Sequence, residues 1–407
     1  MRILIATAGS RGDVAPYTGL GARLRQAGHQ VALASHQGFA ELVAAAGLEF
    51  RALPVDPRQA LASRGGQRLL AAGNGPRAVL ELLKLGREFM PELAAGLLAA
   101  TEAGTDLLLL SSTTAPFGEV IAAALGLPAL RVYLQPLDPT GEFPPIVAGP
   151  RSFGRLGNRA AGQAARLALD QLFGPTVRQL RRRLGPGARQ AVDSPTLHGI
   201  SPTVLPRPRD WHPGLTVDGY WWPHHPDGWQ PPAELADFLQ AGPPPVFLGF
   251  GSLVTDADRL GRVVGTALRR ARLRAVVQAG WTGLRVEGDG VLAVGDLPHH
   301  WLFPRVAAVV HHAGAGTTAA GLRAGVPAVP VPAQLDAPFW SARLTALGVS
   351  PGPVPLRELT ADRLAAALHR AVHEPRHRDR ARAVAGRIAA EDGAAAVLRA
   401  VERIRTR

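Results

Sequence analysis

The residues best suited to chemistry near the start of the chain lie in the stretch TAGSRGDVAP. Asp13 stands there just past two glycines, after an apolar run, RILIAT, that predicts a strand. We expect a loop over Thr7–Pro16 and a helix that opens at Pro16. The carboxyl ends of parallel strands face the crevice in which open α/β sheets bind ligands. Asp13 therefore suits a general base, although a helix cap or an ion pair with Arg11 would also explain it.

A second candidate site follows a buried strand pattern in VAAVVHHAGAGTTAAGLRAGVPAVPVP. His312 comes just before a turn of small residues and threonines that opens a helix, namely Gly314, Ala315, Gly316, Thr317 and Thr318. Unpaired N–H groups and the positive end of the helix dipole meet at a helix N-terminus, so this turn predicts an anion site. A tight strand–helix junction whose glycines serve packing alone is the other interpretation.

Redox and metal chemistry are disfavoured by the same stretches. A dinucleotide fingerprint needs G-x-G-x-x-G and an acid about 20 residues further on, and the second strand pattern ends in ASHQG without a carboxylate. Neighbouring strand residues point to opposite faces, so His299–His300 and His311–His312 cannot each chelate a metal with both rings. Asp256 and Asp258 resemble a metal-binding D-x-D, but their place at a helix start favours capping. We predict no metal site.

Strand patterns alternate with helical patterns in both halves of the chain. This rhythm predicts an α/β protein with two parallel sheets, each covered on both faces. Prolines and four of the seven tryptophans crowd between the halves, which indicates a stiff linker. The predicted domains are an N-terminal Rossmann-like domain (1–215), a Trp/Pro-rich linker (216–245), a C-terminal Rossmann-like domain (246–385) and a C-terminal helix (386–407) that returns to the first domain.

Composition limits the possible partners. The 407 residues include no cysteine, which excludes disulfides, thiolate metal sites and cysteine nucleophiles. The formal net charge of +13 comes almost wholly from arginine, with Lys84 the single lysine. The densest arginine runs, Arg178–Arg189 and Arg376–Arg387, lie on helical patterns with few aromatic residues. We therefore expect solvated helix faces and no nucleic-acid site. No apolar run reaches the about 20 residues that span a bilayer, and the N-terminal pattern is too short for a signal peptide, so we expect a cytoplasmic protein.

These motifs resemble the family 1 glycosyltransferases, especially the bacterial antibiotic, natural-product and sterol-type enzymes. The resemblance covers nearly the whole chain and is most specific from Leu297 to Val349; it includes GSRGDVAP, GYWW, FGS, LPHHWLFPRVAAVVHHAGAGTTAAGLRAGVPAVPVP and LDAPFWSARLTALGV. It implies the GT-B fold, in which two Rossmann-like domains face each other across a cleft. The N-terminal domain of such enzymes holds the acceptor and the C-terminal domain holds a nucleoside diphosphate sugar. Transfer in this branch inverts the anomeric carbon and uses no cofactor or metal.

The resemblance also assigns roles to single residues. Asp13 falls where this branch places its catalytic base, and Ser10 beside it is implicated in holding the acceptor or the donor phosphate. Asp336 matches an acid that holds sugar hydroxyls. The nucleobase pocket matches Leu297 and Pro298, with Trp281 stacking nearby. The diphosphate-gripping positions match Ser252, His312, Ala315, Gly316 and Thr317.

One position departs from the family pattern. The acid is usually followed by Gln, whose amide reads sugar hydroxyls, but Ala337 stands there in QLDAPFW. This loss favours a sugar with fewer hydroxyls, such as a thymidine diphosphate (TDP) deoxysugar. A UDP-glucose-dependent enzyme acting on sterol-like or other lipophilic acceptors is the alternative, and a sugar-nucleotide epimerase or a non-catalytic subunit are more distant ones.

The acceptor segments are predicted to be apolar. They are the helical stretch 59–89 and the loops after Ser111 and Gln135, where leucine, phenylalanine and proline gather. We expect a hydrophobic small-molecule acceptor such as a polyketide.

Overall fold

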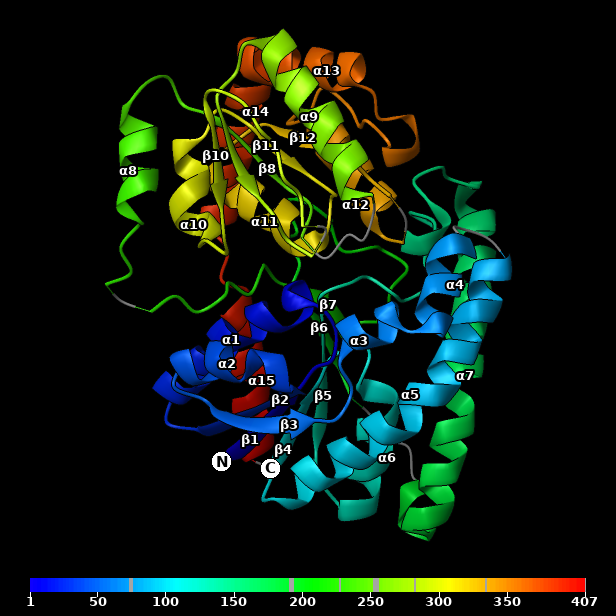
Figure 1. Ribbon diagram of the computed structural model, residues 1–407. Helices are drawn as coiled ribbons and strands as arrows, with labels where there is room; N and C mark the ends of the chain where they lie inside the picture. Colours follow the sequence, from blue (N-terminus) through cyan, green and yellow to red (C-terminus); the bar gives the residue numbers. More distant parts are fainter. Residues whose placement is uncertain are drawn as a thin grey trace. The chain divides into compact units, whose positions relative to one another are not determined.

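The computed structural model describes residues 1–72, 76–189, 194–226, 228–251, 256–281, 283–333 and 335–406. The chain forms two compact units (Figure 1). The first unit comprises Met1–Pro226 and Asp392–Arg407, and the second comprises Asp227–Glu391.

A parallel sheet forms the centre of the first unit. Among the described residues its strands lie in the order β3-β2-β1-β4-β5-β6-β7. They are β1 (Arg2–Ala6), β2 (Gln30–His36), β3 (Glu49–Leu53), β4 (Leu107–Leu110), β5 (Ala129–Tyr133), β6 (Thr196–His198) and β7 (Leu215–Val217). The longer connections are α1 (Arg11–Gln26), α2 (Ala40–Ala45), α3 (Pro57–Ala62), α4 (Arg64–Ala72), α5 (Pro76–Glu102), α6 (Ala115–Leu125), α7 (Gly154–Leu184) and, from the end of the chain, α15 (Gly393–Arg405). Short 3₁₀ turns are η1 (Gln37–Phe39), η2 (Ile146–Ala148) and η3 (Pro186–Arg189).

The sheet of the first unit has an apolar core on each face. Ile3 and Ile5 of β1 join the core under α1, α2 and α15, whereas Leu4 and Ala6 join the core under α5, α6 and α7. Successive strand residues point to opposite faces, so an unbroken apolar run such as Leu107–Leu110 fills both cores. This is why the strands of the first half read as continuous apolar runs.

The helix after β1 begins at Arg11, and the prediction that it opens at Pro16 is wrong. Ser10 is the N-cap, and Asp13 lies at the third helical position, where its carboxylate reaches back to the N-cap backbone. This capping box starts the helix before the proline. Pro16 lies inside the helix and is buried there. Asp13 therefore belongs to the first turn of a helix and not to a loop.

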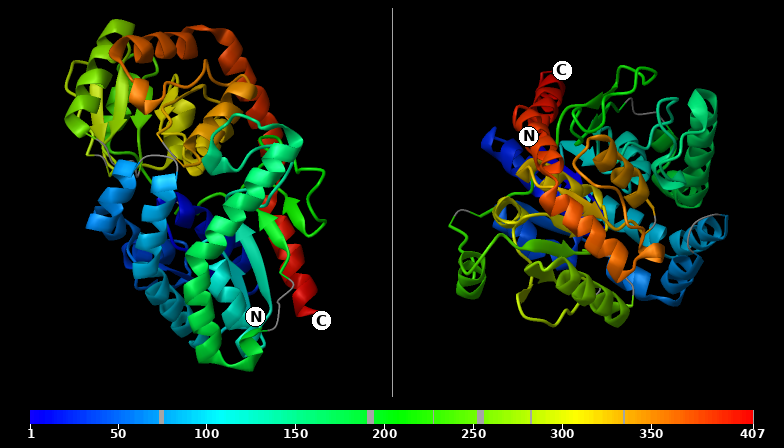
Figure 2. Two further views of the ribbon diagram at one scale, coloured as in Figure 1. Left: turned by 90° about the vertical axis from the view of Figure 1, so that its right-hand side faces the viewer. Right: turned by 90° about the horizontal axis from the view of Figure 1, so that it is seen from above.

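The end of the chain packs on the first unit. The carbonyl of Gly393 accepts a hydrogen bond from the indole of Trp221 at 3.2 Å, and Arg23 pairs with Asp392 at 3.2 Å. Val397 and Val401 of α15 are fully buried in the core that Ile3 and Ile5 share. The N and C termini accordingly lie close together in every ribbon view (Figure 1 and Figure 2). The first residues of the predicted 386–407 helix belong instead to α14 (Pro375–Ala389) of the second unit.

The predicted linker, 216–245, is divided between the units at Pro226. Before that point, the buried ring of Trp221 packs on Tyr17 with ring centroids 5.6 Å apart. Beyond it, α8 (Ala233–Gln240) belongs to the second unit, and Arg274 donates a hydrogen bond to the carbonyl of Phe238. Most of this segment therefore has fixed contacts within one unit or the other.

The second unit repeats the plan with a smaller sheet. Its described strands lie in the order β10-β9-β8-β11-β12 and pair in parallel. They are β8 (Val246–Gly249), β9 (Ala275–Gln278), β10 (Val291–Val294), β11 (Val309–His311) and β12 (Ala328–Pro330). The helices, besides α8 and α14, are α9 (Ala257–Ala271), α10 (His299–Leu302), α11 (Ala315–Ala324), α12 (Ala337–Ala346) and α13 (Ala361–His373), with 3₁₀ turns η4 (Phe303–Arg305) and η5 (Leu356–Glu358).

No helix in the described part of the chain combines the length and the apolar character needed to cross a bilayer.

Candidate active site

Asp13 lies at the carboxyl edge of the first sheet, held by the first turn of α1. Its Oδ2 accepts hydrogen bonds from the backbone N–H of Ser10 at 2.8 Å and from the Ser10 hydroxyl at 3.0 Å. Gly9 makes room for this arrangement, because a Cβ there would lie 2.4 Å from Oδ2 of Asp13, and its φ is +154°. The cap and the base interpretations are thus compatible, since capping occupies only one carboxylate oxygen.

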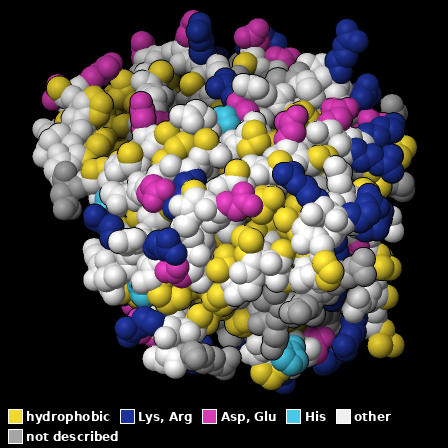
Figure 3. Space-filling model, turned by 90° about the horizontal axis from the view of Figure 1, so that it is seen from below, with side chains coloured by type: hydrophobic (Ala, Val, Ile, Leu, Met, Phe, Trp, Pro, Cys, Tyr) yellow, Lys and Arg dark blue, Asp and Glu magenta, His cyan; other side chains and the backbone are white. Residues whose placement is uncertain are grey.

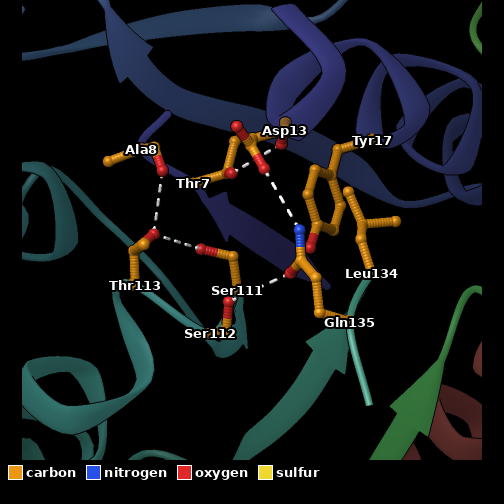
Figure 4. Close-up of a pocket in the computed structure, with 9 residues that line it drawn as sticks. All are labelled: Thr7, Ala8, Asp13, Tyr17, Ser111, Ser112, Thr113, Leu134 and Gln135. Carbon is orange, nitrogen blue, oxygen red and sulfur yellow. Dashed lines mark hydrogen bonds between the residues drawn. The ribbon is translucent and has the colours of Figure 1, made fainter. Parts of the chain in front are cut away.

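The other carboxylate oxygen of Asp13 points toward a small polar pocket (Figure 4). Oδ1 accepts a hydrogen bond from Nε2 of Gln135 at 3.3 Å. The pocket lies where β1, β4 and β5 end, and its lining is Thr7, Ala8, Asp13, Tyr17, Ser111, Ser112, Thr113, Leu134 and Gln135. The structure therefore brings the predicted base to the loops after Ser111 and Gln135, where acceptor contacts were expected.

The hydroxyl groups of this pocket are mostly engaged with one another or with the backbone. Thr113 Oγ1 donates to the carbonyl of Ala8 at 2.9 Å and lies 3.0 Å from Ser111 Oγ, while Thr7 Oγ1 donates to the carbonyl of Asp13 at 2.8 Å. Such a network holds the three strand ends in fixed register around the carboxylate.

Burial raises the pKa of Asp13 above its ordinary value, and the hydrogen bonds from Ser10 and Gln135 oppose the rise. A raised pKa brings a carboxylate closer to the pH at which general bases work best. The geometry and the electrostatics at Asp13 are those of a carboxylate that can accept a proton.

The predicted anion site of the second unit is the N-terminus of α11. Gly314 is the N-cap, and within the described residues no side chain caps the helix. Ala313 before it has a φ of +65°, in the left-handed region that costs a non-glycine residue free energy. Nδ1 of His311, which accepts from the N–H of Ala313 at 3.1 Å, helps to hold that conformation. This strained residue lies in the short turn between the end of β11 at His311 and the start of α11 at Ala315.

His312 stands beside this turn with its ring packed between two glycines. A Cβ on Gly251 would come within 2.9 Å of the ring, and a Cβ on Gly314 would come within 2.5 Å of it. The buried atoms His312 Nδ1 and Thr318 Oγ1 have no hydrogen-bond partner among the described residues. Burial lowers the pKa of His312 to about 4, so the ring is neutral at pH 7 and offers a single N–H donor. The turn thus combines helix amides, a neutral imidazole and unpaired polar atoms, as an anion site requires.

The other predicted donor residues follow neighbouring strands of the same sheet. Trp281 comes after β9, and its backbone N–H donates to the carbonyl of Gly251 at 2.8 Å. Leu297 and Pro298 come after β10 and are half-buried at the start of α10. Ser252, which follows β8, lies outside the described residues.

Asp336 and Ala337 follow β12 at the start of α12. Oδ2 of Asp336 accepts a hydrogen bond from the indole of Trp340 at 2.9 Å. The side chain of Ala337 is 4% exposed, so little of its surface is open to a ligand. Leu335 just before them has a φ of +57° and is exposed.

Within the described residues, no group of three or more histidines, aspartates or glutamates has a geometry that could hold a metal ion. The predicted capping role of Asp256 is confirmed, because its Oδ1 accepts from the N–H of Arg259 at 2.9 Å at the start of α9. Basic and acidic side chains are interspersed over the face drawn in Figure 3.

Sequence reasoning did not identify Gln135 as a partner of Asp13, Ser112 as a partner of Gln135, or the space that Gly9 leaves for the carboxylate. Gln135 lies 122 residues further along the chain than Asp13, and no local motif links the two. The available signal was its place just past a buried strand, where a polar residue reaches the ligand-binding edge of a parallel sheet.

Two family models match the two parts of the chain. The glycosyltransferase family 28 N-terminal domain matches residues 3–110, and the erythromycin biosynthesis protein CIII-like C-terminal domain matches residues 278–404. O-mycaminosyltylonolide 6-deoxyallosyltransferase of Streptomyces fradiae is 37% identical over 97% of this chain and 95% of its own length. A sterol 3-beta-glucosyltransferase of Arabidopsis thaliana is 34% identical over 98% of this chain, which spans 65% of that longer protein.

Solved structures share the fold. The glycosyltransferase SsfS6 of Streptomyces sp. SF2575 has a TM-score of 0.68 at 23% identity, and SnogD of Streptomyces nogalater has 0.68 at 21%, each with 99% of both chains covered. The two parallel α/β units are thus those of a GT-B protein. Its relatives are more than 30% identical over nearly the whole chain. This chain therefore belongs to the family 1 GT-B glycosyltransferases, in the group that includes antibiotic and sterol enzymes.

Proposed function

We propose that this protein is an inverting, metal-independent glycosyltransferase that moves a deoxysugar from a TDP donor to a hydroxyl of a hydrophobic natural product such as a polyketide. The observation that carries the proposal is Asp13, whose Oδ2 is fixed by Ser10 while Oδ1 faces the polar pocket. A carboxylate has about four acceptor positions, so Oδ1 retains capacity for an acceptor hydroxyl beside its bond from Gln135.

The proposed reaction is a single displacement. Oδ1 of Asp13 takes the proton of the acceptor hydroxyl while the acceptor oxygen forms a bond to the anomeric carbon of the sugar. The bond from that carbon to the diphosphate oxygen breaks, and its electron pair leaves with the diphosphate. Attack from the face opposite the leaving group inverts the configuration. The nucleotide sugar is a co-substrate, and no cofactor takes part.

The departing diphosphate needs stabilisation, which we assign to the N-terminus of α11 and His312. The amides of Ala315, Gly316 and Thr317 lie in the first helical turn, where no intrahelical acceptor exists. Donors fixed before the reaction stabilise the charge that develops on the leaving oxygen. Ser252, Trp281, Leu297 and Pro298 complete the proposed nucleotide site, and Asp336 binds the sugar.

A deoxysugar donor is supported by the relative whose name describes a 6-deoxyallosyltransferase. It is also supported by Ala337, at the position where the resemblance to the family implies a glutamine. The structural neighbours SsfS6 and VinC, both glycosyltransferases, have been solved with thymidine diphosphate. A hydrophobic acceptor is supported by the segment after β5, in which Val147 and Phe153 are each 54% exposed. Cytoplasmic residence remains part of this proposal.

UDP-glucose-dependent transfer to a sterol-like lipid is the second candidate. The relative from Arabidopsis thaliana favours it, since it is named a sterol 3-beta-glucosyltransferase at 34% identity.

A donor and acceptor panel tests the proposal. TDP-deoxyhexoses, TDP-glucose and UDP-glucose are each incubated with polyketide aglycones and sterols, with product detected by mass spectrometry and anomeric configuration by NMR. We expect transfer with inversion, fastest from a TDP-deoxyhexose to a polyketide, and unchanged in the presence of a chelator. Transfer only from UDP-glucose to sterols would establish the second candidate, and retention of configuration would contradict the mechanism.

A further inference from the structure

Gln135 connects the carboxylate of Asp13 to the end of a third strand. It follows β5, whereas Asp13 follows β1 and Ser112 follows β4, which lies between them in the sheet. Nε2 of Gln135 donates to Asp13 Oδ1 at 3.3 Å, and Ser112 Oγ donates to Oε1 of Gln135 at 3.4 Å (Figure 4). The three side chains thus form a chain of hydrogen bonds across the strand ends.

The direction of these bonds decides what the amide can do. A glutamine amide can be turned over without changing its shape, and its partners determine which end faces which neighbour. An ionised carboxylate accepts only, so the NH₂ group must face Asp13. The carbonyl then faces Ser112, whose hydroxyl can donate to it. The pocket orients the amide through both of its ends.

We propose that Gln135, oriented by Ser112, is a positioning residue that keeps Asp13 ionised and keeps Oδ1 directed at the acceptor hydroxyl. The catalytic part of this inference rests on the proposed function of Asp13.

The surroundings of Asp13 make such a partner necessary. Burial raises the pKa of the carboxyl, and without opposing bonds it would hold its proton at higher pH and be unable to accept another. Ser10 stabilises the charge at Oδ2, and Gln135 stabilises the charge at Oδ1. Asp13 is also the single carboxylate that lines this pocket in the described part of the chain, so no second acid shares its proton.

The effect of Gln135 on the ionisation of Asp13 can be measured without a substrate. Protein labelled with carboxyl-¹³C aspartate is titrated by NMR, and the Asp13 signal is identified by its absence from Asp13→Asn. In Gln135→Met, which keeps the length and removes the amide, we expect the Asp13 midpoint to rise by about one pH unit, tenfold in its ionisation constant. Gln135→Glu should raise the midpoint further, because a like charge disfavours ionisation. An unchanged midpoint in both variants would overturn the proposal.

Two controls separate positioning from folding. Ser112→Ala leaves the amide in place but releases its carbonyl, so a smaller rise in the same direction is expected. Gln163→Met changes an exposed glutamine on α7 and should leave the midpoint unchanged. A shift in Gln163→Met as large as that in Gln135→Met would overturn the specific role of Gln135.

The catalytic role is tested with the most active donor and acceptor from the panel above. In Gln135→Met, the midpoint of the acid limb of the kcat/KM–pH profile should rise by about one pH unit, as in the NMR titration. The KM for the donor should stay unchanged. If Asp13→Asn remains active, the proposed base fails, although the NMR result for Gln135 can stand. If Asp13→Asn is inactive and Gln135→Met keeps the wild-type acid limb, only the role of Gln135 fails.

Discussion

The two candidate sites differ in how their polar atoms are satisfied. In the first unit, Asp13 is bonded by Ser10 and Gln135, and the nearby hydroxyls bond to one another or to the backbone. In the second unit, His312 Nδ1 and Thr318 Oγ1 are buried without a partner among the described residues. The first site is complete before a ligand arrives, whereas the second leaves polar atoms for a ligand to satisfy.

The backbones differ in the same way. Among the described non-glycine residues, positive φ angles occur at Arg272, Ala313 and Leu335, all in the second unit. Ala313 and Leu335 lie in the loops after adjacent strands, next to the proposed diphosphate and sugar sites. A base must hold its geometry and ionisation before the acceptor binds, while an anion site can leave strain and unpaired donors for the anion to offset.

The largest effect is expected at Asp13. Asp13→Asn keeps an oxygen for the Ser10 cap but removes the base, so turnover with an alcohol acceptor should fall by about 10² to 10⁴. Affinity for the nucleoside diphosphate, measured by calorimetry, should stay as in wild type because the proposed nucleotide site belongs to the other unit. Turnover with a strongly acidic phenol acceptor should fall less, because such a phenol is already partly ionised when it binds. A variant that retains more than half the wild-type rate would make Asp13 structural.

Gly9→Ala tests whether the first site tolerates movement. The added methyl would lie 2.4 Å from Oδ2 of Asp13, so the carboxylate must shift. A misplacement of about 1 Å can cost about 10² in rate, and we expect a fall of that order in kcat. Gly386→Ala is the matched control, because nothing lies within 4 Å of a methyl at that helical position. Equal effects in both variants would contradict the fit described for Gly9.

His312→Ala tests the open site. Loss of its hydrogen bond should weaken nucleoside diphosphate binding by about 1.5–3 kcal/mol, and turnover should fall as well, because charge grows on the leaving group. Any loss of stability in the free protein should come from the lost packing of the ring against Gly251 and Gly314, since Nδ1 has no hydrogen-bond partner among the described residues. Calorimetry and thermal unfolding measure both quantities, with the exposed His369→Ala as control. Unchanged affinity would remove His312 from the site.

Acid should destabilise the protein through its buried neutral histidines. Burial lowers the pKa of His198 to about 4, of His311 to about 3 and of His312 to about 4, from 6.5. Because these histidines bind protons less readily in the folded state than in the unfolded state, acid favours unfolding. The folded state keeps its full stability above pH 6.5 and loses it as the pH falls toward 4. Each histidine should therefore remove about 1–2 kcal/mol from the unfolding free energy between pH 7 and pH 5. Urea titrations at several pH values measure this, and an unfolding free energy that is flat over that range would contradict it.

The smallest effect concerns Ala337. A glutamine there would leave a buried amide unpaired opposite a deoxygenated carbon of the sugar, which would cost about 1–3 kcal/mol in binding free energy. We expect a TDP-deoxyhexose to exceed UDP-glucose by about tenfold in kcat/KM, near 1.4 kcal/mol, and Ala337→Gln to narrow that ratio. Because the Ala337 side chain is 4% exposed, the variant should be checked for an unchanged melting temperature. A native preference for UDP-glucose would contradict the donor assignment.

Much of the fold followed from local patterns. The apolar runs at β1, β4 and β8 predicted parallel strands because a strand buried on both faces needs no polar alternation. The start of α1 was missed because Pro16 was weighed as a first helical residue, while the capping box at Ser10 and Asp13 acted earlier in the chain. The division of the linker at Pro226 was also missed, since the packing of Trp221 on Tyr17 joins distant segments.

The sequence by itself determined which residues end each strand, and therefore that Asp13 and His312 lie at the carboxyl edges of two parallel sheets. Strand periodicity and helix-start chemistry are local, so they can be read along the chain. Only the tertiary structure decided that Gln135 meets Asp13 and is itself bonded by Ser112, and that Ser10 occupies one carboxylate oxygen and leaves the other to the pocket. It also decided that the pKa of Asp13 is raised. Burial and hydrogen bonding depend on which strands become neighbours, and β1, β4 and β5 become neighbours only when the sheet assembles.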